Sequence, residues 1–152
     1  MTSLESECLS LIEQNNEEFS YSLQKYKLHT LATKEISSQS DSIFGYFLLY
    51  LLAKGQTKRY SLNRLELSDV IDINKSECIK TVDHIWRCSI LGDIPQMKHA
   101  LDALPKTHLK IGLAACEFLQ ERKGRWKSAR EEGRKVRFNK LLKHPICSSE
   151  YK

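Results

Sequence analysis

The segment 42–54 constrains the fold of this chain more than any other, because it is apolar on every side of a helix. It contains nine large aliphatic or aromatic residues, and its first charged side chain is Lys54. A run of this length without a turn signal favours a fully buried helix over a strand, although aromatic residues are common in strands too. Gly55 follows, where a helix commonly ends in a left-handed conformation. Other elements must therefore enclose this helix.

The segments on either side have helical periodicity. Thr2 or Ser3 can cap a first helix, with Glu5 in capping-box register. The expected buried face of that helix consists of Leu4, Cys8, Leu11 and Ile12, and a second stretch after Asn15-Asn16 contains Phe19, Leu23 and Tyr26. Further helices are predicted over 61–71, 76–91 and 96–104.

A last helical stretch is predicted from Thr107 to Lys143, with Gly112, Gly124 and Gly133 as weak points. Its expected inner face consists of Leu109, Leu113, Cys116 and Leu119. No segment alternates with the period of two that is typical of strands. The prediction is an all-α protein, a compact helical domain of about five to seven helices with a long basic C-terminal helix.

Charge is distributed unevenly along the chain. The net charge of all 152 residues is +5, yet the segment 106–143 alone has twelve Lys or Arg against four Glu. We therefore expect a helical core domain over 1–105 and a basic helical segment over 106–152, packed on the core or extending from it. A localised positive charge attracts phosphates, and its binding weakens as salt rises.

Five of these basic residues fall on one stripe of the expected helix. They are Lys123, Lys127, Arg130, Arg134 and Arg137. They lie within about 80° of one another and span about 21 Å, which is long enough to follow several phosphates. Arg125 and Lys140 widen the positive surface, and Trp126 is placed to stack on a base.

This basic stripe predicts a non-enzymatic nucleic-acid-binding protein. RNA is favoured over DNA, because A-form duplexes are bound largely through backbone contacts and shape. Homodimerisation would double the positive surface. The same composition is common among small viral accessory proteins, including ones that sequester RNA. The alternative is a protein-interaction adaptor, or a subunit of a larger assembly, whose charged helix docks on an acidic partner; Glu131 and Glu132 also suit a solvated face.

The segment 65–85 resembles the helix-turn-helix family. The positions that carry the resemblance are Leu67, Val70 and Ile71 in a first helix, Ile73 in the turn, and Cys78, Val82 and Ile85 inside a second helix. The resemblance implies a DNA-binding regulator that uses Lys80 and Arg87. Asp72 stands where glycine is usual, and Ile79 where an exposed polar residue is usual. Glu77 and Asp83 also give the second helix a poor charge for a DNA groove.

Metal-binding and catalytic patterns are weak. Cys78, His84 and Cys88, with His99 beyond them, lack the close Cys-x-x-Cys pair of most zinc sites, as do His144 and Cys147. Asp69 and Asp72 have no evident basic or metal-binding partner, and none of the common catalytic motifs is present. We predict no enzymatic activity, no metal, no cofactor and no small-molecule substrate.

Cysteine usage and the N-terminal sequence bear on location. Five widely spaced cysteines favour a reducing compartment. The N-terminus lacks the basic start and apolar core of a secretory signal. The longest apolar run has about half the length that crosses a bilayer. We expect a soluble cytoplasmic protein, with the nucleus as the alternative, that is neither secreted nor inserted in a membrane.

Overall fold

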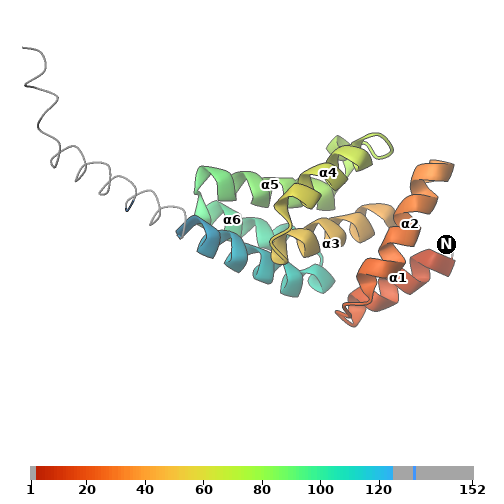
Figure 1. Ribbon diagram of the computed structural model, residues 1–152, viewed down its shortest axis with the longest axis horizontal. Helices are drawn as coiled ribbons and strands as arrows, with labels where there is room; N and C mark the ends of the chain where they lie inside the picture. The colour runs from red at the N-terminus through yellow and green to blue at the C-terminus, as the bar shows by residue number, and fades with distance from the viewer. Residues whose placement is uncertain (1–2, 125–131, 133–152) are drawn as a thin grey trace, which may run out of the picture. The chain divides into compact units, whose positions relative to one another are not determined.

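The computed structural model describes residues 3–124 and Glu132 (Figure 1). Within these residues every regular element is helical and no strand occurs, which confirms the all-α prediction. The α-helices are α1 Ser3–Glu13, α2 Phe19–Thr33, α3 Ser40–Ala53, α4 Thr57–Ser68, α5 Glu77–Leu91 and α6 Ile94–Ala100. Short 3-10 turns are η1 Ile73–Lys75, η2 Leu101–Ala103 and η3 Lys106–His108. A further helix occupies residues 109–124.

The chain divides into two compact units, Met1–Gln120 and Glu121–Lys152. The charge pattern had placed the boundary after residue 105 instead. Residues 106–120 lie in the first unit, where Ala115, Cys116 and Leu119 are buried in its core. The apolar side of this segment therefore completes the first unit, and the most basic part of the sequence follows it.

Helix α3 is the centre of the first unit, as predicted for the segment 42–54. Ten of its 14 residues are buried, and it contacts α1, α2, α4 and α5 (Figure 1). Burying each large apolar side chain contributes about 1.5–3 kcal/mol to stability. The packing of α3 therefore stabilises the positions of the four helices that contact it. Gly55 has a φ of 73°, the left-handed conformation expected after this helix.

The helices around α3 follow the predicted pattern with shifted ends. Phe19, Leu23 and Tyr26 of α2 are buried. Helix α4 begins four residues before the predicted 61, because Tyr60 is drawn into the core and its amide donates to the carbonyl of Gln56 at 2.9 Å. Asp93 caps α6 by accepting the Gln96 amide at 3.1 Å, so α6 begins two residues before the predicted start.

The last described helix buries Cys116 and Leu119 as predicted, but not the rest of the predicted face. Leu109 and Leu113 are 36% and 52% exposed, so their predicted place in the core was wrong. Gly112 is buried instead, and a Cβ there would lie only 2.9 Å from Leu104 Cδ1. The helix lies so close to the η2 turn that only the side with glycine, which has no side chain, fits against it. This requirement turns the two leucines outward.

Candidate functional site

The predicted nucleic-acid interface starts at the end of the last described helix. Lys123 is helical and partly buried, and Gly124, one of the predicted weak points, is the last helical residue before the described range ends and is exposed. The other predicted contacts, Arg125, Trp126, Lys127, Arg130, Arg134, Arg137 and Lys140, lie outside the described residues. The continuous basic stripe therefore stays a prediction from sequence.

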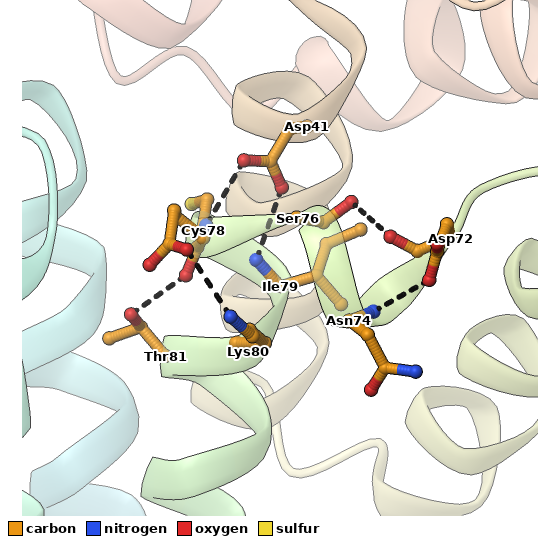
Figure 2. Close-up of polar contacts among 9 residues, drawn as sticks. Asp41, Asp72, Asn74, Ser76, Cys78, Ile79, Lys80 and Thr81 are labelled. Carbon is orange, nitrogen blue, oxygen red and sulfur yellow. Dashed lines mark hydrogen bonds and ion pairs between the residues drawn. The ribbon is translucent and has the colours of Figure 1, made fainter.

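The turn between α4 and α5, where the helix-turn-helix resemblance falls, is closed by side-chain hydrogen bonds (Figure 2). Asp72 Oδ1 accepts the amide of Asn74 at 3.1 Å, and Ser76 Oγ donates to the carbonyl of Asp72 at 3.1 Å. An aspartate that bonds to the backbone two residues on can replace the glycine of a tight turn. Asp69, which the sequence suggested as a second carboxylate beside Asp72, is exposed at the end of α4. Asp72 thus has a structural use.

An aspartate from another helix occupies the N-terminus of α5. Asp41, in the first turn of α3, accepts the amide of Cys78 at 3.1 Å and the amide of Ile79 at 3.2 Å (Figure 2). Its carboxylate satisfies two of the free amides at this helix end and interacts favourably with the helix dipole. A side chain of the protein therefore fills the place where a helix N-terminus would bind a phosphate.

Helix α5 packs deep in the first unit. Ile79, at the position where a reading helix usually exposes a polar residue, has no exposed surface. Gly45 lets α3 approach closely, since a Cβ there would lie 2.2 Å from Cys78 Sγ. Lys80 and Arg87 are exposed, and Lys80 pairs with Glu77 at 3.2 Å. DNA binding by this helix stays a prediction that rests on these two cations.

The acidic residue Asp83 of α5 is neutralised by α4. Arg64 donates to both carboxylate oxygens of Asp83, with Nε 2.9 and 2.8 Å from them and Nη2 2.7 Å from Oδ2. The buried Tyr60 hydroxyl donates to the same carboxylate at 2.7 Å. Burial, together with this hydrogen bond, raises the pKa of Tyr60. These three groups fix α4 against α5.

The residues considered for zinc have other contacts. His84 Nε2 lies 3.6 Å from Cys88 Sγ, and His99 Nδ1 lies 3.4 Å from Asp102. Burial raises the pKa of Cys78 to about 12, so this thiol is protonated near neutral pH. Among the residues that the structure describes, no group of three or more His, Cys, Asp or Glu is placed to hold a metal ion. His144 and Cys147 lie outside those residues.

A groove that the sequence did not reveal lies between α2 and α4, with a volume of about 270 Å³. We call it the α2/α4 groove; its lining is Gln24, Lys27, Leu28, Phe47, Arg59, Leu62, Asn63 and Glu66. Lys27 donates to Asn63 Oδ1 at 2.5 Å and pairs with Glu66, which joins the two walls. The one sequence feature that could have indicated this groove is Leu62, an apolar residue that does not share the helix face of the buried positions 60, 63 and 67 of α4.

Comparison of the chain with protein-family models, curated proteins and solved structures finds no match. Across residues 3–124, the helices are too short or too polar to cross a membrane.

Proposed function

We propose that the protein is a non-enzymatic RNA-binding protein that contacts the phosphate backbone through basic residues of its C-terminal segment. The observation that carries the proposal is the charge of the two units. Glu121–Lys152 contains eleven Lys or Arg and four Glu, a net charge of +7. Met1–Gln120 contains 13 basic and 15 acidic residues, a net charge of −2. A phosphate backbone is therefore attracted to the second unit.

Contacts within the first unit support the same division of roles. Asp41 fills the N-terminus of α5, Arg64 is committed to Asp83, and Lys27 to Glu66. Every buried side-chain nitrogen or oxygen among the described residues has a hydrogen-bond partner. These groups stabilise the helical scaffold and are not available to a phosphate backbone.

The proposed mechanism is ionic contact with release of counterions. Five contacts, from Lys123, Lys127, Arg130, Arg134 and Arg137, correspond to a slope of log K against log salt of about −3.5 on single strands and about −4.5 on duplexes. Because such contacts read backbone shape and charge, affinity is expected to depend little on base sequence.

A gel-shift titration with single-stranded and duplex RNA and DNA across a salt series tests the proposal. The double variant Arg130→Glu/Arg134→Glu should lose about a hundredfold in RNA affinity, because two contacts become repulsive. The matched control is Lys80→Glu/Arg87→Glu, which makes the same charge change at exposed positions of α5. The control should change RNA affinity by less than about twofold. Circular dichroism and gel filtration verify that both variants keep fold and size.

Two outcomes would contradict the proposal. A larger loss in the α5 variant, with DNA preferred over RNA, would favour the helix-turn-helix alternative. Failure of the unaltered chain to retain any RNA at low salt, with tight binding to an acidic protein, would favour the adaptor.

A further inference from the structure

We propose that the α2/α4 groove binds a short acidic segment of a partner protein through one or two apolar anchor side chains. This surface belongs to the first unit and uses none of the residues assigned to RNA. It therefore gives the protein a second binding activity that does not depend on the first.

Exposed leucines on both walls indicate a docking surface for apolar side chains. Leu28 of α2 is 67% exposed and Leu62 of α4 is 57% exposed, and the buried Phe47 of α3 is also part of the lining. The volume of about 270 Å³ is below the roughly 300–1,000 Å³ of most small-molecule pockets. The groove thus suits one or two side chains of a peptide better than a cofactor.

The charge of the groove favours an acidic peptide, since its lining contains Lys27 and Arg59 against Glu66. Helices α2 and α4 together carry five basic residues and one acidic residue, Glu66, although the whole unit has a net charge of −2. The basic residues are Lys25, Lys27, Lys58, Arg59 and Arg64. Lys27 is compensated by Glu66 and Arg64 by Asp83. The excess charge is complementary to an acidic segment.

The three remaining cations form no salt bridge among the described residues, and Arg59 is the one of them that lines the groove. Arg59 lines the groove and donates to the neutral oxygen of Gln56 at 2.8 Å. Lys25 lies over the ring of Tyr21, 4.3 Å from its centre. Lys58 is exposed at the start of α4. Arg59 can therefore pair with a carboxylate next to an apolar anchor, and Lys25 and Lys58 add positive charge to the same two helices.

Hydrogen bonds fix the two walls relative to each other before a partner binds. Lys27 of α2 bonds to Asn63 and Glu66 of α4, and within α4 Asn63 Nδ2 donates to the carbonyl of Arg59 at 2.7 Å. A groove whose walls are already fixed loses less conformational entropy on binding. The lining also favours protein over nucleic acid, since its aromatic ring, Phe47, is only 3% exposed and offers little surface for a base to stack on.

Selection of a random peptide library displayed on phage, against the full chain at about 0.15 M salt, tests the proposal. Enriched peptides should be acidic and contain large apolar residues. Leu62→Glu and Arg59→Glu should each weaken their binding by about tenfold or more. The matched control is Leu65→Glu, because Leu65 is 63% exposed on the same helix and does not line the groove. Leu65→Glu should change binding by less than about twofold.

Three outcomes would overturn the proposal. The first is that no peptide is enriched. The second is that acidic peptides bind equally well to the Leu62→Glu variant, as they would if they attached to the basic C-terminal segment. The third is that duplex RNA displaces the peptides and loses affinity in the Arg59→Glu variant, which would make the groove part of an RNA surface. Thermal melting of each variant confirms that the fold is intact, and Leu62→Ala provides a milder second change.

Discussion

The imidazole of His108 has no exposed surface, and both of its nitrogens are hydrogen-bonded. Nε2 lies 2.8 Å from the carbonyl oxygen of Ser42, and Nδ1 lies 2.8 Å from Thr107 Oγ1. The carbonyl can only accept, so the ring carries its hydrogen on Nε2 and accepts from Thr107 at Nδ1. The ring of Tyr46 meets it edge to face with centres 5.3 Å apart. In its neutral form this residue joins η3, the turn that precedes the last described helix, to α3.

The buried His108 makes stability depend on pH. Burial lowers its pKa below 6.5, against the opposing effects of the Ser42 carbonyl and Asp41. Below pH 6.5 the unfolded chain therefore binds a proton at His108 more readily than the folded chain does. As a result, the free energy of unfolding falls as the pH drops below 6.5, by up to about 1.4 kcal/mol for each pH unit. Urea denaturation at about pH 7.5 and about pH 5.5 measures the loss.

The control for this prediction is His108→Gln, which keeps a side-chain donor near Ser42 but does not titrate. Its stability should depend less on pH than that of the unaltered chain over the same interval. Equal pH dependence in the two proteins would show that other groups are responsible.

At the scale of elements, the contact between α3 and α5 organises the first unit. Gly45 brings the two helices together, and Asp41 of α3 caps α5 through the amides of Cys78 and Ile79. The cap is supplied from a distant helix, 37 positions earlier in the sequence than Cys78. The neighbouring Ser76, which sequence rules would make the cap, bonds to the carbonyl of Asp72 instead.

Removing this cap should destabilise the protein without changing its core. Asp41→Ala leaves two amides at the start of α5 without their acceptor, and we expect a cost of about 1–2 kcal/mol in the free energy of unfolding. Asp41→Asn keeps one acceptor and should cost less. The matched control is Asp69→Ala, an exposed aspartate at the end of α4, which should cost no more than about 0.5 kcal/mol. Equal losses for Asp41→Ala and Asp69→Ala, measured by urea denaturation, would contradict the role of the cap.

At the scale of the whole molecule, the first unit has one core that draws on segments throughout residues 3–120. Cys8 of α1, Cys78 of α5 and Cys116 of the last described helix are all buried in it. Burial raises the pKa of Cys8 and of Cys116 to about 11, and that of Cys78 to about 12. The thiolate is the reactive form of cysteine. These thiols are therefore protected from reaction both because reagents cannot reach them and because they stay protonated near neutral pH.

This common core predicts that the thiols react together. In a Cys147→Ser variant, which removes the cysteine outside the described residues, we expect slow reaction of every remaining thiol with a disulfide reagent near neutral pH. Denaturant should expose all of them in a single transition, because small domains usually unfold cooperatively. Rapid reaction of Cys78 or Cys116 in the native protein would contradict the packing of α5 and of the last described helix.

The predictable part of the fold is the part that local pattern decides. The segment 42–54 contains too many apolar residues for any exposed face, so its burial as α3 followed from composition alone. The left-handed φ of Gly55 followed from its position after a helix. In residues 109–124 the predicted burial of Cys116 and Leu119 was confirmed, and that of Leu109 and Leu113 was wrong. Leu113 is more apolar than Gly112, and only the close approach to Leu101 and Leu104 selects the glycine.

The sequence by itself determined the helical class, the central place of α3 and the concentration of basic residues in the segment 106–143, because periodicity and charge are local properties. Only the tertiary structure decided that Asp41 caps α5, that Arg64 neutralises Asp83, and that Leu28 and Leu62 face one groove. Each of these pairs joins helices separated in the chain. The spacing of residues within one helix indicates which of its side chains share a face. It does not indicate which side chains of another helix will lie within hydrogen-bond distance, about 3 Å, of that face.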